Sequence, residues 1–232
     1  MIMETEKNIK VSILIEVGID NGVVMEEILE KEPKERILDL AQNRFFANGF
    51  NKVTLDELSG ELGISKKTMY KFFPSKEDLV KTIVHMTLRS AQKEVERITL
   101  QEKPFVHRLA EVMLFMGKMT SRLGRPFLND MQRFAPTIWK EADEFRRVHL
   151  LSKVISMIHQ AKQEHVFRND VNEEVIVMML TACIQNIVTP DVLSQHSFSP
   201  KDAMYTIFHV IFEGALTEEA RKEFLNYEII IL

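Results

Sequence analysis

A lysine-rich stretch from Ile64 to Lys76 is the part of the sequence best equipped to bind a charged partner. It carries Lys66, Lys67, Lys71 and Lys76 and no acidic residue. Lysine ammonium groups pair with phosphate oxygens, so a nucleic-acid backbone is one partner that fits. On charge alone, a solvated helix face is the more common explanation. The helices that carry the stretch therefore have to be identified before one of these two explanations can be chosen.

Two short helices are predicted around these lysines. The pattern Thr54-Leu55-Asp56-Glu57 is a capping box, and the helix that it opens ends at Gly63. Ser65 can cap the next helix, Lys66 to Phe72. Two short helices joined by Gly63-Ile64-Ser65 predict a helix-turn-helix, whose second helix enters the DNA major groove.

The rest of the chain is expected to be helical as well, which makes the fold class all-α. The segment from Lys34 to Asn48 has apolar residues at the helical period, and Ser75 can cap a longer helix. Only 8 Gly and 7 Pro leave few turns, and prolines stand mostly where helices should begin. The later helices are expected to start near Pro104, Pro126, Pro136 (reaching about His165), Asn172, Pro200 and Thr217.

Three parts are predicted along the chain: an N-terminal extension, residues 1–31; a helix-turn-helix domain, residues 32–85; and a larger helical domain, residues 86–232. The extension is acidic, with a net charge of −5 over its first 30 residues. It is either a natural extension or the product of an upstream start codon, with Met25 the true beginning. Residues 31–98 carry a net charge of +3 although the chain carries −4, and within them the lysine-rich stretch, residues 64–76, holds four lysines and no acidic residue.

Membrane proteins, disulfide-rich proteins and enzymes find little support. The longest apolar run, residues 175–188, is interrupted by Thr181, Gln185 and Asn186. The single cysteine, Cys183, lies in an apolar helix, and the N-terminus lacks a secretory signal, so a reducing cytoplasm is expected. His159 and His165 are six residues apart and do not share a helix face. No catalytic residue, metal site or cofactor is therefore predicted.

The stretch from Phe45 to Leu79 resembles the DNA-binding domain of the TetR family of bacterial transcriptional regulators. The resemblance is carried by Gly49-Phe50, Val53-Thr54-Leu55, Leu58, Leu62-Gly63-Ile64-Ser65, Lys67-Thr68-Met69-Tyr70, Phe73-Pro74-Ser75-Lys76 and Glu77-Asp78-Leu79. A second, weaker similarity covers Pro126-Phe127-Leu128-Asn129-Asp130 and Ala135-Pro136-Thr137-Ile138-Trp139. The remainder matches only in its helical outline.

The resemblance implies a double-stranded operator as the partner and assigns DNA-binding residues. Lys66, Lys67 and Thr68 would approach base edges, while Tyr70, Lys71 and Lys76 would hold phosphates. Thr54 and Ser65 would stand at the starts of the two helices, where simple capping is the alternative to DNA contact. For Tyr70 the alternative is partial burial against the first helix, and Phe72 stands where many family members carry a smaller residue.

The resemblance also implies a homodimer and a small-molecule effector. Two helices, residues 173–189 and 200–216, would pair with those of a second subunit through Ile184, Ile187, Val188, Phe208, Ile211, Phe212 and Ala215. An adaptable apolar cavity would be lined by Met113, Met116, Phe127, Met131, Trp139, Met157, Met178 and Met179. For both sets the alternative is ordinary core packing.

The sequence thus predicts a dimeric repressor that a small apolar ligand releases from its operator. An activator or a ligand-independent regulator is the alternative within the same class. A helical interaction protein without DNA binding is the alternative from a different class, and the retained lysines speak against it.

Overall fold

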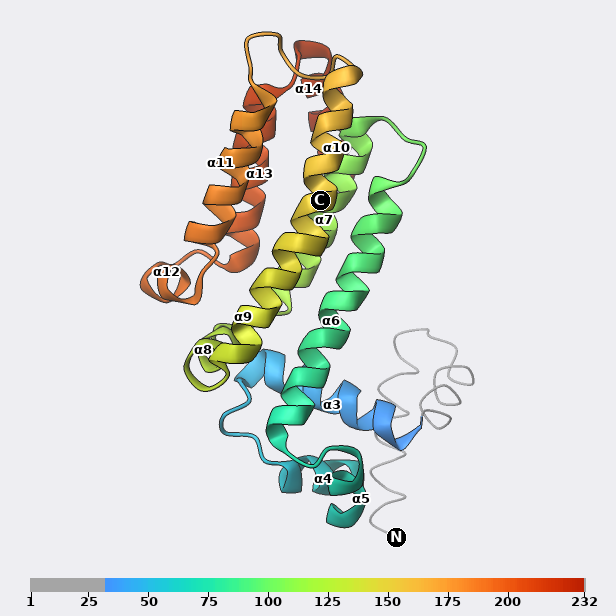
Figure 1. Cartoon of the computed structure of the whole chain (residues 1–232), viewed down its shortest axis with the longest axis vertical. Coiled ribbons are helices and arrows are strands. Elements are labelled where there is room, and N and C mark those ends of the chain that lie inside the picture. Colours follow the sequence, from blue (N-terminus) through green and yellow to red (C-terminus); the bar gives the residue numbers. More distant parts are fainter. Residues whose placement is uncertain (1–31, 232) are drawn as a thin grey trace.

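The computed structural model describes residues 32–231, and this part of the chain is built from helices (Figure 1). They are α3 (Pro33–Asn48), α4 (Leu55–Leu62), α5 (Lys66–Phe72), α6 (Lys76–Thr99), α7 (Phe105–Ser121), α8 (Arg125–Phe134), α9 (Pro136–Phe145), the π-helical segment η1 (Arg146–Leu151), α10 (Ser152–Gln163), α11 (Glu173–Ile187), α12 (Pro190–Gln195), α13 (Pro200–Ala215) and α14 (Glu218–Ile231). Between residues 32 and 231, β-structure is limited to a bridge between Phe167 and Leu216. The all-α prediction is confirmed, while the predicted extension, residues 1–31, lies outside the described residues.

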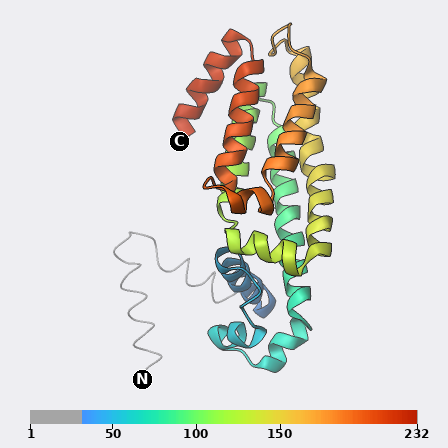
Figure 2. The ribbon, with the colours of Figure 1, turned by 90° about the vertical axis from the view of Figure 1, so that its left-hand side faces the viewer.

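The helices form an elongated molecule with two ends of different construction (Figures 1 and 2). The short helices α3, α4 and α5 gather at one end, and α6 leads from them into a bundle of longer helices. In the bundle, α13 packs against α7 and α11, and α14 returns along α7. Among the described helices, none is both long enough and apolar enough to cross a membrane.

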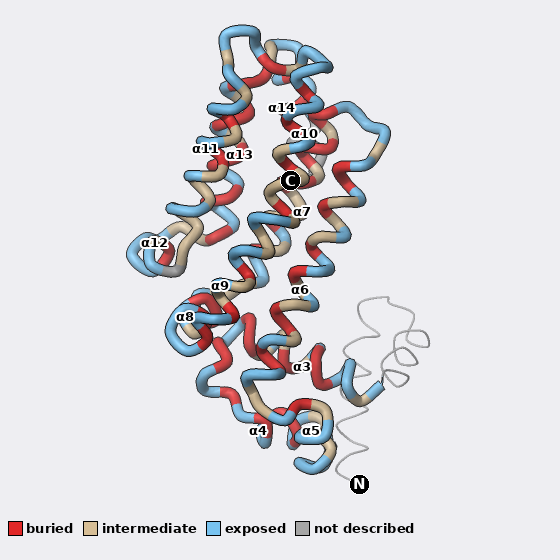
Figure 3. The backbone as a smooth tube through the Cα atoms, viewed as in Figure 1, coloured by how far each residue is buried: buried red, intermediate tan, exposed pale blue. Residues whose placement is uncertain are grey.

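Two large hydrophobic clusters fill the interior, and Figure 3 marks the buried residues along the helices in red. The first lies under α3–α5 and the start of α6, and it continues into α8 and α9 through Phe127, Met131 and Ile138. The second joins α7, α10, α11, α13 and α14. The predicted domain boundary at residue 85 falls inside α6, and the first cluster extends across it. The helix-turn-helix end is therefore packed directly against α8 and α9.

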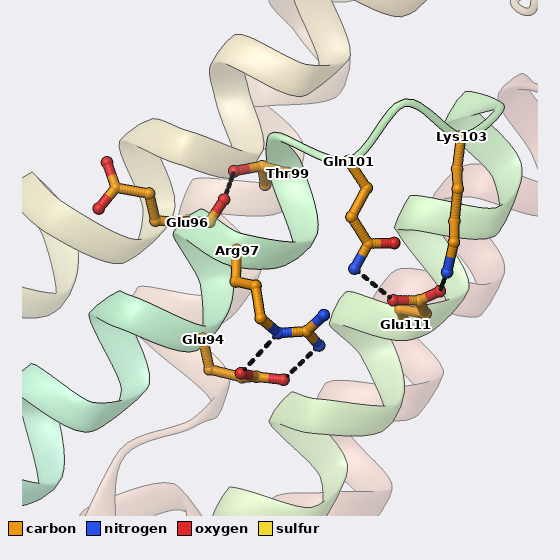
Figure 4. Close-up of polar contacts among 7 residues, drawn as sticks. All are labelled: Glu94, Glu96, Arg97, Thr99, Gln101, Lys103 and Glu111. Carbon is orange, nitrogen blue, oxygen red and sulfur yellow. Dashed lines mark hydrogen bonds and ion pairs between the residues drawn. The ribbon is translucent and has the colours of Figure 1, made fainter.

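Polar contacts fix the turn between α6 and α7 (Figure 4). Arg97 pairs with Glu94 one turn earlier in α6, at 2.6 Å. Beyond the turn, Glu111 of α7 accepts hydrogen bonds from Lys103 Nζ at 2.5 Å and from Gln101 Nε2 at 3.1 Å. The Glu111 contacts tie the turn to the start of α7, and the Arg97–Glu94 pair lies within the last turns of α6.

The predicted helix from Pro136 to about His165 is a rod of three parts. Its ends, α9 and α10, are α-helical, and η1 between them is π-helical, with hydrogen bonds spanning five residues instead of four. The rod ends at Gln163, and His165 adopts a positive φ of 52° in the turn that follows.

Candidate nucleic-acid interface and effector cavity

Helix α4 begins with the capping box that the sequence predicts. Thr54 Oγ1 accepts a hydrogen bond from the Glu57 amide at 3.1 Å, and Glu57 Oε2 accepts one from the Thr54 amide at 2.8 Å. The hydrogen bond from the Thr54 amide is the main cause that lowers the pKa of the Glu57 carboxyl. Thr54 therefore caps α4, and its side chain is committed to the helix start.

The turn between α4 and α5 depends on Gly63. Its φ of 66° is left-handed, a conformation that side chains with a Cβ disfavour, and it lets the Ile64 amide donate to Ser59 O at 3.0 Å. Ser65 then caps α5 by accepting a hydrogen bond from the Thr68 amide at 3.1 Å, and its Oγ also lies 2.9 Å from Thr68 Oγ1. The two short helices form the predicted helix-turn-helix.

Helix α5 buries one side and exposes the other. Met69 is fully buried in the cluster beneath the helix, and Phe72 is half-buried against the same cluster. Lys67 and Lys71 are exposed, and the Tyr70 side chain is 47% exposed. Among the described residues, no carboxylate pairs with either lysine. This side of α5 presents free ammonium groups next to an aromatic hydroxyl, which suits phosphate oxygens and base edges.

Lys66 and Lys76 have partners inside the protein. Lys66 Nζ lies 2.6 Å from Asp56 Oδ2, and this hydrogen bond is the main cause that raises the pKa of Lys66. Lys76 Nζ donates to the main-chain carbonyl of Asn51 at 2.9 Å. Both lysines therefore connect neighbouring elements. Of the four lysines, Lys67 and Lys71 are the two for which the described residues show no such contact.

Two contacts that the sequence analysis missed fix the helix-turn-helix end to α8. The Gly124 amide donates to Phe46 O at 2.8 Å, and a Cβ at Gly124 would lie 2.5 Å from that oxygen. Asp130 Oδ2 accepts a hydrogen bond from the Asn51 amide at 2.7 Å. Asn51 thus bonds to both α8 and α6. The second similarity, which includes Asp130, was the only sequence signal for this junction.

A cavity of about 360 Å³ lies between the helices of the bundle. Its apolar wall comes from α6 to α13 and consists of Val95, Met116, Met119, Leu123, Leu128, Trp139, Leu150, Leu151, Val154, Ile184, Val188, Leu193, Pro200, Met204 and Phe208. Its polar lining consists of Thr120, Gln132, Asp143, Arg146, Arg147, Gln185, Thr189 and Asp191. A mostly apolar hollow with a few polar groups is the usual form of a small-molecule site.

The eight predicted cavity residues lie in three kinds of place. Met116 and Trp139 line the cavity. Met113, Phe127, Met131 and Met157 are buried in the hydrophobic clusters and are not part of the lining. Met178 and Met179 are 69% and 49% exposed on the outside of α11. Other lining residues, such as Leu150 and Met204, could not be predicted from the sequence, because the side of each helix that faces inward depends on how the helices pack.

The seven predicted interface residues point mainly inward. Ile184, Val188 and Phe208 line the cavity, Ile187 is half-buried against the second cluster, and Ile211, Phe212 and Ala215 are buried in it. The outward side of the same two helices carries a different apolar set. We call it the outer face, and its exposed residues are Val175, Met178 and Met179 of α11 and Tyr205 and Val210 of α13.

Comparisons with known proteins agree with this construction. Residues 37–83 match the family of bacterial regulatory proteins described as the tetR family. The chain is 23% identical over 168 residues to the uncharacterised HTH-type transcriptional regulator YvaF of Bacillus subtilis, covering 72% of this chain and 87% of YvaF. It is 22% identical over 180 residues to the nucleoid occlusion factor SlmA of Pectobacterium carotovorum, covering 75% of this chain and 90% of SlmA. The solved structure of the TetR family protein CprB from S. coelicolor has the same fold, with a TM-score of 0.61 at 15% identity, covering 85% of this chain and 95% of CprB.

Proposed function

Because this chain is a transcriptional regulator of the TetR family, we propose that it represses transcription as a homodimer that a small ligand releases from a palindromic operator. The observation that carries the proposal is the exposed side of α5, where Lys67, Tyr70 and Lys71 stand free of carboxylate partners within the described residues. In a helix-turn-helix this second helix enters the major groove. The cytoplasm is the expected compartment.

The outer face supports the homodimer. It combines apolar side chains of two neighbouring helices, and the Val210 side chain is 64% exposed. Exposed apolar side chains on neighbouring helices are candidates for an interaction site. A two-fold axis that runs along the length of the molecule beside the outer face would place both copies of α5 at the same end of the dimer, where half-sites about 34 Å apart lie in successive major grooves.

The cavity and α8 support release by a ligand. Leu128 and Gln132 of α8 line the cavity, while Asp130 of the same helix holds Asn51 beside the helix-turn-helix. A ligand that binds better when α8 is displaced would favour dimers whose α5 helices no longer match the groove spacing. Release then follows from differential affinity for two states.

The first test is selection of random duplex DNA by the purified full chain. We expect recovery of a palindrome, and we expect the double variant Lys67→Ala, Tyr70→Ala to recover none. Binding of the selected duplex should weaken steeply as salt rises, because lysine contacts with phosphates release counterions. A lack of enrichment at moderate salt, or a flat salt dependence, would contradict operator binding by the chain alone.

The dimer is tested by placing charge on the outer face. Met178→Asp with Val210→Asp should convert the protein to a monomer in analytical ultracentrifugation and weaken operator binding, because two carboxylates per subunit cannot be buried in an apolar interface. Met86→Asp, at an exposed methionine of α6, is the matched control. A dimer that withstands the double variant would place the interface elsewhere.

A second candidate within the class is a ligand-independent regulator or an activator. A protein whose operator affinity does not change on binding any cavity ligand would favour the former. A reporter gene whose expression rises with this protein would favour the latter.

A further inference from the structure

Each of the two arginines that line the cavity is paired with a neighbouring carboxylate. Arg146 Nη2 lies 3.1 Å from Asp143 Oδ1, and the Arg146 guanidinium carbon lies 4.9 Å from the centre of the Trp139 ring. Arg147 makes hydrogen bonds of 2.6 and 2.7 Å to the two carboxylate oxygens of Glu144. Both cations therefore already have an anionic partner.

The remaining carboxylate makes the cavity mouth unattractive to anions. Asp191 lines the cavity, is exposed, and has no ion-pair partner among the described residues. The two lining arginines, each already paired with Asp143 or Glu144, thus share the cavity with a third carboxylate, Asp191. An anionic ligand would have to compete with two carboxylates for the arginines and would meet the third. A cationic ligand would meet both guanidinium groups and would have to displace Arg146 from Trp139.

Two neutral amides at the cavity are not engaged in this way. Gln132 of α8 and Gln185 of α11 both line it and are exposed to solvent. Within residues 32–231, neither side-chain amide has a hydrogen-bond partner. The two lining hydroxyls, in contrast, are used: Thr120 donates to Met116 O at 2.8 Å, and Thr189 accepts from the Val192 amide at 3.3 Å. The amides can both donate and accept, so they suit a hydroxyl or a carbonyl.

We propose that the cavity takes an uncharged, largely apolar molecule whose polar group is a hydroxyl or carbonyl that hydrogen-bonds to Gln132 or Gln185. The apolar part lies against the wall formed by residues such as Leu150, Val154 and Met204. This inference rests on the proposed function, because it names the chemical class of the effector. It also excludes fatty acids and lipophilic cations as the preferred ligands.

Three probes of equal chain length test the class of ligand. We would measure the binding of 1-decanol, decanoate and decyltrimethylammonium to the full chain without DNA, below the solubility limit of decanol and below the micelle-forming concentrations of the two charged probes. Trp139 is the single tryptophan in the sequence and lines the cavity, so its fluorescence reports occupancy directly. Calorimetry supplies the dissociation constants. We expect decanol to bind at least about tenfold more tightly than either charged probe, because each charged head group disturbs an ion pair.

The polar contact is tested by the double variant Gln132→Leu, Gln185→Leu. Decanol should bind about fivefold more weakly to it, which corresponds to the loss of a single neutral hydrogen bond. Gln195→Leu, at an exposed glutamine at the end of α12 that does not line the cavity, is the matched control and should change nothing.

Tighter binding of decanoate or of the cation would overturn the proposal, and so would the absence of decanol binding or an unchanged affinity in the double variant. Because these measurements contain no DNA, they are independent of the operator test. A chain that selects a palindrome but prefers decanoate would retain the proposed function and lose this inference.

Discussion

The two ends of the molecule position their functional side chains in different ways. At the helix-turn-helix end, the bonds that set α4 and α5 join residues three positions apart, as Thr54 with Glu57 and Ser65 with Thr68. The cavity is lined by residues from Val95 to Phe208, and no short segment builds it. The first end is specified locally and the second by tertiary packing. Substitutions should therefore act directly on DNA affinity at the first end and through helix positions at the second.

The largest effect is expected where local structure presents side chains to DNA. The double variant Lys67→Ala, Tyr70→Ala should lower affinity for the selected operator by about 100-fold or more, because contacts worth about 1–3 kcal/mol each are lost in both subunits. Its melting temperature should stay close to that of the wild type, since both side chains are exposed. Fluorescence anisotropy measures the affinity. Lys140→Ala, at an exposed lysine of α9, is the control, and an equal loss there would point to a non-specific charge effect.

The junction between the two ends gives the next effect. Gly124→Ala places a Cβ 2.5 Å from Phe46 O and should lower the free energy of unfolding by about 2 kcal/mol, because neither backbone can move without disturbing the packing of α3 on α8. Gly60→Ala is the matched control. Its added Cβ meets no atom within 4 Å and it lies inside α4, so it should raise stability by up to about 1 kcal/mol. Urea denaturation measures both, and equal effects would contradict the close approach at Gly124.

Helix caps allow the two ends of the molecule to be compared directly, because a helix at each end begins with a capping box. Thr54 caps α4, and Ser199 caps α13, where its Oγ accepts from the Asp202 amide at 3.1 Å. Thr54→Ala and Ser199→Ala should each cost about 1 kcal/mol in free energy of unfolding, since a cap is local wherever it occurs. Thermal denaturation measures the two. A cap that matters at one end alone would mean that packing also sets the helix starts.

The smallest effect concerns an ion pair between helices. Glu141 of α9 accepts a hydrogen bond from Lys81 of α6 at 3.1 Å, the main cause that lowers the pKa of the Glu141 carboxyl, and its Oε2 also lies 3.1 Å from Nε2 of His85 in α6. A lowered folded-state pKa adds stability above the ordinary pKa of about 4.3, and that stability is lost as the pH falls through the folded value. The stability difference between wild type and Glu141→Gln should thus be present at about pH 7 and shrink towards about pH 3.

Glu94→Gln is the control for that pair, because Glu94 bonds to Arg97 within α6 and its pKa is lowered by the same kind of bond. Urea denaturation at the two pH values should give a change of the same sign in both variants. A difference that grows on acidification in either variant would contradict the lowered pKa.

The same division explains what could be predicted from the sequence. The sequence predicts helix α5 with its observed bounds, Lys66–Phe72, because Ser65 caps its start and Pro74-Ser75 stops it just beyond its end. The cavity depends on which side of each helix faces inward. Residue type alone placed Met178 beside Met116, whereas packing leaves Met178 outside and turns Ile184 towards the hollow. The partners of Lys66 and Lys76 could not be predicted from the sequence either, because Asp56 and the Asn51 carbonyl come close to them only in the folded chain.

The π-helical segment η1 determines the direction in which the buried side of α10 faces relative to the buried side of α9. Along a regular α-helix each residue turns the chain by about 100°, which would set the buried stripe of α10, around Val154 and Ile158, well over 90° away from that of α9, around Ile138 and Ala142. A π turn holds one residue more and removes about 100° of that rotation. The two stripes therefore face nearly the same side. Deleting one residue in η1 should therefore give an unbroken α-helix that keeps both stripes on the same side, whereas the full set of residues wound as a regular α-helix would swing one stripe away from the core.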